Sequence, residues 1–559
     1  MKKTFKRSLS VLLAAVMLLS FTALGSANAA DSGEAASAVS APQSYGLPET
    51  IQEGAILHCW CWSYNTIKDN LPQIAAAGFK TVQTSPVQRP KDYSVSYKDI
   101  SGQWWKLYQP LGLSVAGSNT SWIGSKEELT ALCTEADKYG IKVVVDIVAN
   151  HLANKNSAGG GFSNVNTNVD ADLYNAAYFH SNTAGMTGVT TRYGITQNHL
   201  GMPDLNTGNE YVQSKVVSLI NECLECGVDG FRYDAAKHIE LPDEQPYNGN
   251  NFASDFWTLV LDNNSEFQYG EILPGADRIE DYAKIMKVTA ANYGSNLRQA
   301  IINKKLTTTA IKNNRMINID NTQAVMWVES HDNYTDDGTW SALNNDQINL
   351  GWAVIAAQGD STPLFFARPK GSSTTSQWGS NKMGQAGDGN YYSQTVSAVN
   401  HFRNAMVGES KNVVEIVKQK VQMIERGTKG AVLVSVSDGE TNVNVSTNLE
   451  AGEYTDRISG ETFTVANGKL TGKVGASAVV VLYNDAEEVL VGDVNNNGEI
   501  DIDDATTLQR HLAKFTLAGG APIIDETDPK QFMVADVDKD GDITILDVTV
   551  IQQMLARFI

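Results

Sequence analysis

The sequence lacks an excess of basic charge. It contains 43 Lys and Arg residues against 63 Asp and Glu residues, which gives a formal net charge of -20. Nucleic acids and anionic membranes bind clustered basic side chains, so this balance argues against both as partners and favours neutral ligands or cations. With 559 residues, 42% of them hydrophobic and 19% charged, the chain is typical of a globular protein with several domains.

Cysteines are few and odd in number, so they cannot all pair within the chain. Cys223 and Cys226 form a CxxC pattern, which could indicate redox chemistry or a zinc site. No second ligand pair follows at zinc spacing, and the pattern lies in a helix expected over Val212–Cys226. Two small buried side chains one helical turn apart are the favoured interpretation, and a redox function is the alternative. The remaining cysteines are Cys59, Cys61 and Cys133.

Long hydrophobic runs are also missing beyond the first thirty residues. A basic start, an apolar stretch over Val11–Phe21 and the small-x-small sequence Ala27-Asn28-Ala29 predict a signal peptide at 1–29. The apolar stretch is shorter than the roughly 20 residues of a spanning helix, although an uncleaved anchor is the alternative. Residues 30–48, rich in Ala, Ser and Gly, are expected to be a flexible leader. We therefore expect a secreted, extracellular protein that does not bind a membrane.

Short apolar runs alternate with helix-period segments such as Lys126–Tyr139 between residues 49 and 408. This alternation predicts a (β/α)8 TIM barrel, in which functional side chains lie at the C-terminal ends of the strands. Residues 152–206, rich in Asn, Gly and Thr, are expected to form a subdomain B inserted after the third strand. The strand-like runs are Ala55–Trp60, Lys80–Thr84, Lys142–Val148, Val228–Tyr233, Phe267–Glu271, Lys287–Ala291, Ala324–Glu329 and Thr362–Ala367.

The composition changes twice after the barrel. Alternating apolar and polar residues with turn residues between them predict a C-terminal β-sandwich domain over 409–486. Residues 487–559 then contain 15 acidic and 5 basic residues, a net charge of -10. Half of the charge of the whole chain therefore lies in this tail.

The tail contains a repeated calcium-loop pattern, with oxygen-bearing residues at positions 1, 3, 5, 9 and 12 and a glycine at position 6. Each loop precedes one expected helix, Ala505–Ala513 or Val548–Phe558, and position 12 is Asp instead of the Glu of an EF-hand. The expected ligands of two Ca²⁺ ions are Asp493, Asn495, Asn497, Asp501 and Asp504, then Asp536, Asp538, Asp540, Thr544 and Asp547.

This small α-helical, calcium-binding tail over 487–559 resembles a type I dockerin. The resemblance implies a cohesin module of a scaffoldin as partner, and hence attachment to a multi-enzyme complex. Loop positions 10 and 11, through which dockerins contact cohesins, are Ile502-Asp503 and Ile545-Leu546 in the two repeats. They differ from the Ser-Thr pair of the best-known type, so a divergent cohesin is expected.

Carboxylates recur at the expected ends of the fourth, fifth and seventh barrel strands, where Asp234, Glu271 and Asp332 lie. A single carboxylate there could cap a helix. Three of them, accompanied by an arginine and histidines, favour a catalytic rim. Such a rim suits glycoside cleavage, in which one carboxylate attacks the anomeric carbon and another protonates the leaving oxygen.

The segments DIVANH, GFRYDAAKHIELP, YGE and WVESHDN resemble the signature regions of the α-amylase family, glycoside hydrolase family 13. The similarity extends from about Gly54 to Tyr483, and the flanking sequences resemble the saccharifying bacterial type. It implies retaining, endo-acting hydrolysis of internal α-1,4-glucosidic bonds in starch and maltooligosaccharides. By position, Asp234 is the nucleophile, Glu271 the general acid/base and Asp332 the stabiliser of the transition state.

Other site residues also follow from this resemblance. Arg232 is expected to keep Asp234 ionised, whereas the acid role of Glu271 requires a raised pKa. Trp104 and Trp105 are equally consistent with a core role and a sugar-binding role. The expected substrate-binding residues are Tyr108, Gln109, His151, Arg232, Lys237, His238 and His331.

The family resemblance further implies one structural Ca²⁺ between subdomain B and the barrel. Its expected ligands are Asn150, Asp204 and the carbonyl oxygens of His238 and Thr196, although the loop before Asp204 is one residue shorter than in relatives. Ser330 stands where chloride-activated relatives have Asn, so no chloride is expected. Two alternatives remain: a relative that cleaves α-1,6 bonds or forms cyclodextrins, and a starch-binding protein with an inactive barrel.

Overall fold

The computed structural model describes residues 45–559, apart from 94–99, 156–157, 276–277, 485–489, 498, 518 and 557–559. The expected signal peptide and most of the expected leader lie outside the described residues. Among the residues that are described, the structure contains no helix long and apolar enough to cross a membrane.

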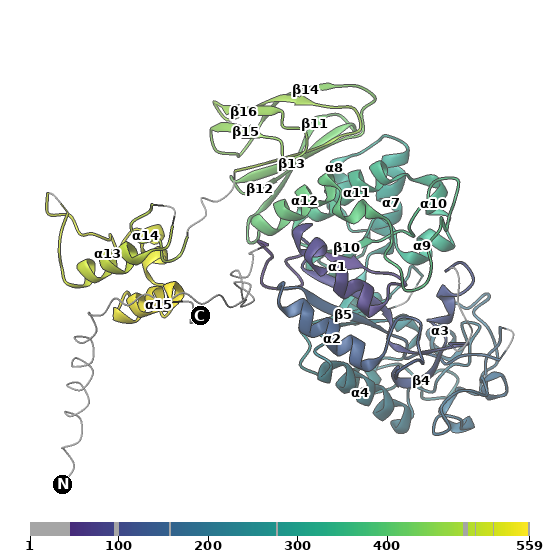
Figure 1. Cartoon of the computed structure of the whole chain (residues 1–559). Coiled ribbons are helices and arrows are strands. Elements are labelled where there is room, and N and C mark those ends of the chain that lie inside the picture. The colour runs from purple at the N-terminus through teal and green to yellow at the C-terminus, as the bar shows by residue number, and fades with distance from the viewer. Residues whose placement is uncertain are drawn as a thin grey trace, which may run out of the picture. The chain divides into compact units, whose positions relative to one another are not determined.

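Eight parallel strands close into a barrel in the order β1-β10-β9-β8-β7-β6-β5-β2 (Figure 1). Each of them falls within or beside one of the apolar runs, so the predicted barrel is confirmed. The strands are β1 (Ile56–His58), β2 (Thr81–Pro86), β5 (Lys142–Ile147), β6 (Gly230–Tyr233), β7 (Phe267–Gly270), β8 (Lys287–Thr289), β9 (Ala324–Met326) and β10 (Thr362–Phe366).

Helices follow the strands around the barrel. The two helices predicted from periodicity are present, and Ser125 and Asn209 cap their first turns with side-chain oxygens. The helices are α1 (Tyr64–Ala76), α2 (Lys126–Asp137), α3 (Arg192–Gln197), α4 (Glu210–Glu225), α5 (Phe256–Val260), α6 (Ile279–Ala283), α7 (Ala291–Ile302), α8 (Thr308–Lys312), α9 (His331–Thr335), α10 (Thr339–Ala342), α11 (Asn345–Gln358) and α12 (Gln394–Ala405).

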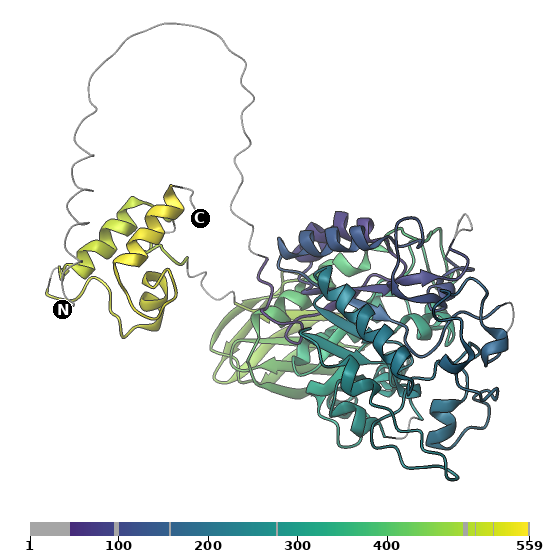
Figure 2. The ribbon, with the colours of Figure 1, turned by 90° about the horizontal axis from the view of Figure 1, so that it is seen from below.

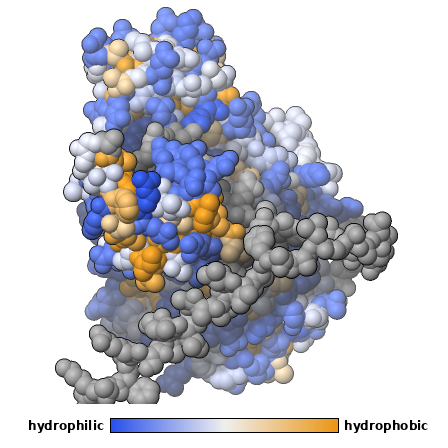
Figure 3. Space-filling view, turned by 60° about the vertical axis from the view of Figure 1, so that its left-hand side comes forward, coloured by the Kyte–Doolittle hydropathy of each residue, from blue (hydrophilic) through white to orange (hydrophobic). Residues whose placement is uncertain are grey.

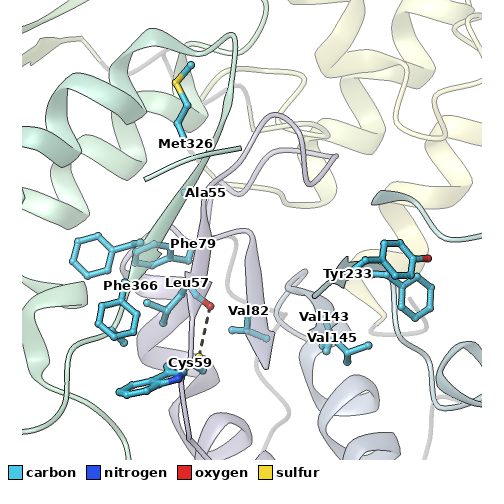
Figure 4. Packing of buried hydrophobic residues seen from close by; sticks show 14 of the residues in the cluster. Ala55, Leu57, Cys59, Phe79, Val82, Val143, Val145, Tyr233, Met326 and Phe366 are labelled. Atoms are coloured by element: carbon cyan, nitrogen blue, oxygen red, sulfur yellow. Dashed lines mark hydrogen bonds between the residues drawn. The ribbon is translucent and has the colours of Figure 1, made fainter. Parts of the chain in front are cut away.

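Strand alternation decides which side chains face the barrel axis. Leu57, Val82, Val143 and Val145 point outward into the layer between strands and helices (Figure 4). Neighbouring positions point inward, so Asp146 on β5 faces the same interior as the aliphatic residues at the bottom of the barrel. All five cysteines are buried and unpaired, and Cys223 and Cys226 are packed at the end of α4, as the structural interpretation predicts.

The segment between β5 and β6 forms the expected insertion, with α3 and the 3-10 turns Phe162–Asn164 and Ala176–Tyr178. A small antiparallel sheet of β3 (Gln88–Pro90) and β4 (Pro110–Val115) lies in the chain between β2 and α2. The sequence does not predict this sheet, because β3 is only three residues long and contains a proline. Further 3-10 turns span Trp104–Lys106, Ala236–His238, Asn321–Gln323 and Gly389–Tyr392.

The predicted β-sandwich is also confirmed. Two antiparallel four-stranded sheets, in the orders β11-β12-β13-β18 and β14-β17-β16-β15, enclose their own apolar core. The first sheet packs against α11 and α12 of the barrel (Figure 1). The strands are β11 (Lys411–Val417), β12 (Val421–Arg426), β13 (Gly430–Ser435), β14 (Thr441–Ser446), β15 (Gly452–Thr455), β16 (Thr462–Ala466), β17 (Lys469–Val474) and β18 (Val479–Tyr483).

The C-terminal segment contains two main helices, α13 (Ile502–Leu512) and α15 (Ile545–Leu555), which pack side by side (Figure 2). Both helices begin three residues before the predicted starts, because Asp501 and Thr544 are N-caps that form capping boxes with the residues at loop position 12. The sequence does not predict the short helix α14 (Pro529–Ala535). Buried residues from all these elements form a separate small core.

A buried arginine joins the first and last strands of the barrel. Arg403 on α12 is 1% exposed and donates hydrogen bonds to the carbonyl oxygens of Gln52, Gly54, Ala356 and Ser361, at 2.9, 2.9, 3.2 and 2.7 Å. Two of these carbonyls precede β1 and one precedes β10, so a single guanidinium satisfies backbone groups on both sides of the seam. Burial, together with the charge of Arg426, lowers the pKa of Arg403 to about 9.

Replacing this side chain by one of similar length without donors tests its role in closing the barrel. Arg403→Met leaves these buried carbonyls without a donor, and we expect the free energy of barrel unfolding to fall by about 3 kcal/mol. Urea unfolding followed by tryptophan fluorescence measures the effect. Arg315→Met, at an exposed position, is the control and should leave the curve in place. An unchanged midpoint for Arg403→Met would contradict this role.

Candidate active site

A pocket of about 440 Å³ opens at the C-terminal ends of the barrel strands. Its wall includes every residue that the sequence assigns to catalysis and substrate binding except Arg232, which lines a smaller cavity beneath it. Side chains from the turn after β6, the end of β7, the start of α9 and the inserted segment meet here. The lining residues are Trp104, Trp105, Tyr108, Gln109, His151, Met186, Leu200, Met202, Asp234, Ala235, Lys237, His238, Glu271, Leu273, His331 and Asp332.

The guanidinium of Arg232 is the centre of the site. Its Nη1 lies 2.8 Å from both carboxylate oxygens of Asp146 and 2.7 Å from Oδ1 of Asp234, while Nη2 lies 2.9 Å from Oε2 of Glu271. All of these side chains are largely buried, so the ion pairs are little screened by solvent. One buried cation thus contacts three carboxylates.

An aromatic ring connects this cluster to the pocket wall. The hydroxyl of Tyr108 donates to Oδ2 of Asp146 at 3.1 Å, and its ring stacks on His331 with centroids 5.1 Å apart. The ring of His151 lies beside the carbonyl oxygen of Tyr108, with Nε2 at 3.0 Å. Tyr108, His151 and His331 therefore hold one another in place on one side of the carboxylates.

The local backbone places the two central carboxylates. Ala235, directly after Asp234, has φ of 50°, and its N–H donates to Oε2 of Glu271 at 2.9 Å. A left-handed alanine is sterically unfavourable, which is typical of a functional turn. Gly270, before Glu271, has no room for a side chain, since a Cβ would lie 2.8 Å from that of Ala236.

The pocket histidines are neutral at pH 7. Burial lowers the pKa of His151 to about 4 and, together with the charge of Arg232, lowers that of His331 to about 3. Burial also lowers the pKa of His238 to about 4. Neutral imidazoles can donate and accept hydrogen bonds from hydroxyl groups without adding charge to the site.

The carboxylates compete for a single guanidinium, and their pKa values differ from the sequence expectation. Burial raises the pKa of Asp234, and Arg232, which was expected to keep Asp234 ionised, lowers it by less than burial raises it. For Glu271, burial is outweighed by Arg232 and the N–H of Ala235, which lower its pKa instead of raising it. Burial and the charge of Glu271 raise the pKa of Asp332 to about 8.

The pocket also has an apolar wall that the sequence analysis missed. Met186, Leu200 and Met202 come from the inserted segment, and Leu273 follows Glu271 by two residues. The signal that could have identified the first three is their position as isolated apolar residues in a segment rich in Asn, Gly and Thr. Both Trp104 and Trp105 line the pocket, and Trp105 is partly exposed, which favours the sugar-binding interpretation over the core one.

The acidic loops of the C-terminal segment are folded alike. Carboxylate oxygens of Asp536, Asp538 and Asp540 all lie within 4.8 Å of one another, as ligands of one cation would. Asp547 instead accepts the N–H groups of Asp538 and Thr544, at 3.1 and 2.7 Å. Equivalent hydrogen bonds join Asp504 to the backbone in the first loop, where Asn495 and Asn497 replace two of the carboxylates.

Comparison with known proteins finds two families along the chain. A family model described as the α-amylase catalytic domain matches residues 120–343, and one described as the type I dockerin domain matches residues 491–556. The chain is 38% identical over 449 residues to an α-amylase of Clostridium acetobutylicum, a match that covers 78% of this chain and 55% of that protein. This chain carries an α-amylase catalytic domain and a type I dockerin domain.

Other relatives extend the same result. An α-amylase of Butyrivibrio fibrisolvens is 35% identical over 472 residues, which covers 78% of this chain and 47% of that protein. The chain therefore spans about half the length of these curated relatives. The solved structure of α-amylase I from Eisenia fetida has a TM-score of 0.60 at 18% identity and covers 78% of this chain and 98% of that one, which supports the fold.

Both families bind calcium, and the residues expected to hold an ion in the α-amylase domain are buried oxygen carriers. The Nδ2 of Asn150 donates to Oδ1 of Asp204 at 2.9 Å, and Nδ1 of His180 lies 2.8 Å from Oδ2 of the same carboxylate. Thr196 lies on α3, which packs against the turn of His238. An amide oxygen, a carboxylate and main-chain carbonyls are ligands that calcium prefers, so the residues fit the ion. His180, which the sequence analysis missed, orients Asp204.

The dockerin domain exposes apolar side chains at the start of its two main helices. Ile502 and Ile545, which occupy the same loop position in the two repeats, are each 59% exposed, and Leu546 is exposed beside Ile545. Apolar surface gathers on this domain in the space-filling view (Figure 3). Exposed apolar residues at repeated positions indicate a surface for binding another protein.

Proposed function

We propose that this chain hydrolyses internal α-1,4-glucosidic bonds of starch and maltooligosaccharides with retention of configuration. Asp234 is the nucleophile, Glu271 the general acid/base and Asp332 the stabiliser of the transition state. The observation that carries the proposal is that Asp234 and Glu271 contact one guanidinium from opposite ends, at 2.7 and 2.9 Å, and both line the same pocket. Two carboxyl groups in one sugar-sized pocket are what glycoside hydrolysis requires, and retention follows from the nucleophilic role proposed for Asp234.

The remaining residues have roles that suit a glucan. The neutral imidazoles of His151 and His331 bind sugar hydroxyls beside the scissile bond, and the ring of Tyr108 packs on the sugar. Lys237 and His238, which line the same pocket, contact the leaving-group side. The Eisenia fetida enzyme, which shares the fold, has also been solved as a mutant in complex with maltohexaose.

The proton of the carboxylate cluster must move when substrate binds. In the free site Glu271 is ionised beside Arg232, whereas leaving-group departure needs Glu271 protonated and Asp234 ionised. Interacting carboxylates titrate as one system, so the proton belongs to the cluster and not to a single residue. A glucan that excludes water and places its glycosidic oxygen beside Glu271 favours the protonated form there, and Arg232 then stabilises the charge on Asp234.

A retaining mechanism predicts the anomer that appears first. Hydrolysis of maltoheptaose should release α-anomeric products, because displacement by Asp234 followed by water inverts the same carbon twice. Proton NMR in the first minutes of reaction measures this. Asp234→Asn should lower kcat by about a thousandfold or more while the protein stays folded. Initial β-anomers would exclude the mechanism, and normal activity of the variant would exclude the nucleophile.

The proton shared by the carboxylates also sets an upper pH limit for catalysis. Because burial and the charge of Glu271 raise the pKa of Asp332 to about 8, Asp332 loses its proton above that value, and the cluster then has one proton fewer for the leaving group. We expect kcat/KM for maltoheptaose to fall about tenfold per pH unit above this limit. Initial rates between pH 5 and pH 10 on folded enzyme measure the profile. A kcat/KM that stays constant to pH 10 would contradict the shared proton.

The chain is further proposed to be secreted and to attach to a cohesin-bearing scaffoldin through its dockerin domain. Support comes from the dockerin match, the two acidic loops and the exposed Ile502 and Ile545. One Ca²⁺ held by Asn150, Asp204 and the carbonyls of Thr196 and His238 would stabilise the barrel, and two more would organise the loops.

Cleavage of α-1,6 bonds or cyclodextrin formation is the alternative activity, which product analysis on amylose and pullulan distinguishes.

The barrel and dockerin ions should act separately. Asp204→Asn should abolish the rise in barrel Tm caused by calcium, because an ion that binds only the folded state stabilises it by mass action. Asp540→Asn should instead abolish calcium-dependent binding to a panel of cohesins, because loop folding and metal binding are coupled. Calorimetry of each variant measures both effects, and each serves as the control for the other. Cohesin binding by wild type in excess chelator would contradict the proposal.

A further inference from the structure

A second buried ion pair lies behind the active site, and neither of its residues lines the pocket. Arg368, after β10, and Glu329, after β9, are 4% and 2% exposed. The guanidinium makes a two-pronged contact, with Nε on Oε1 and Nη2 on Oε2 of Glu329, the latter at 2.8 Å. Such forked pairs are geometrically specific, because the planar guanidinium matches the carboxylate.

The same pair fixes the chain that follows Asp332. The Nη1 of Arg368 donates to the carbonyl oxygen of Leu343 at 2.9 Å, and the hydroxyl of Thr339 donates to Oε2 of Glu329 at 2.6 Å. Both contacts lie in or just after α10. The ion pair therefore connects the end of β9, α10 and the segment after β10.

The guanidinium also contacts the helix that carries two pocket residues. Arg368 lies over the ring of Tyr334, 5.5 Å from its centroid, and Tyr334 belongs to α9 together with His331 and Asp332. The ring of Tyr334 further packs on Trp60, which contacts His331. A cation over an aromatic ring at a buried site is attractive and directional.

Helix α9 cannot hold these side chains by itself. It spans five residues, His331–Thr335, which is little more than one turn, and so short a helix depends on tertiary contacts. Its start is fixed by the capping box of Ser330 and Asn333. The side chain of Tyr334 fixes the helix to its surroundings, and Arg368 is one of the groups that this ring contacts.

We propose that Glu329 and Arg368 are positioning residues that set the placement of Asp332 and His331 relative to Asp234 and Glu271. The proposal rests on the proposed glycosidase function. The pair acts through Tyr334 and α10 and has no contact with substrate. Its loss should therefore reduce the rate of the bound complex and leave substrate binding nearly unchanged, because a small misplacement of groups that act in the transition state lowers kcat.

Separating this role from simple stabilisation needs paired variants. Glu329→Gln leaves a buried guanidinium unpaired and should lower both Tm and kcat. The double variant Glu329→Gln/Arg368→Met buries no unpaired charge, so its Tm should recover towards that of wild type. Its kcat should remain at least about tenfold lower, with KM within about twofold, because the contacts that Arg368 makes to Leu343 and Tyr334 are lost with its side chain.

A second variant keeps the test decisive if the double variant does not fold. Arg368→Lys retains the charge opposite Glu329 but loses both the forked contact and the Nη1 group that reaches Leu343, so the protein should fold with a reduced kcat. The control is Glu425→Gln in the β-sandwich, a carboxylate that is 0% exposed and accepts bonds from Asn412, Thr447 and Asn448. It should lower Tm and leave kcat unchanged.

Steady-state kinetics on maltoheptaose and thermal unfolding of all four variants give the outcome. A kcat that recovers together with Tm in the double variant, or a wild-type kcat in Arg368→Lys, would overturn the proposal. If the wild type cleaves no glucan, the proposed function itself fails, and the positioning role fails with it. The two failures can be told apart, because a loss of the proposed function is seen in the wild type, whereas a failure of the positioning role is seen only in the variants.

Discussion

A positive charge buried among carboxylates is the constraint on which the active site depends. Arg232 faces the barrel axis from β6, where its charge is stable only because Asp146, Asp234 and Glu271 surround it. The barrel supplies these partners from adjacent strands, since the C-terminal ends of β5, β6 and β7 lie side by side. The cluster can therefore exchange a proton among its members without exposing the charge to water. This property is what two-step glycoside cleavage requires of its two carboxyl groups.

Much of this arrangement could be predicted from the sequence. Each barrel strand is an apolar run with turn residues around it, and the carboxylates at the strand ends mark the site. Reasoning about residue pairs missed that burial raises the pKa of Asp234 and that Arg232 lowers the pKa of Glu271, because it paired Arg232 with one carboxylate when several share it. Met186 and His180 could not be placed either, since the inserted segment has no periodic pattern. Only the folded chain shows which of its side chains reach the barrel.

The two domains identified by comparison use acidic residues in different ways. In the barrel, a shared guanidinium holds carboxylates together, while burial raises the pKa of Asp234 and Asp332. In the dockerin loops, Asp536, Asp538 and Asp540 converge near the surface, where a cation is the natural partner for like charges. The sequence predicts these loops well because the spacing of the ligands is local. It misplaces the helix starts, since Asp501 and Thr544 serve as both loop residue and N-cap.

In the proposed mechanism Asp234, held by Arg232, forms a covalent bond to the sugar. Incubation of the protein with a 2-deoxy-2,2-difluoro-maltosyl reagent that carries a good leaving group should accumulate the glycosyl-enzyme, because the fluorines slow its hydrolysis. Peptide mass spectrometry should then find the sugar on Asp234 and nowhere else, and the label should be absent from Asp234→Asn. A label on Glu271 or Asp332, or no label on an enzyme that still cleaves starch, would contradict the account.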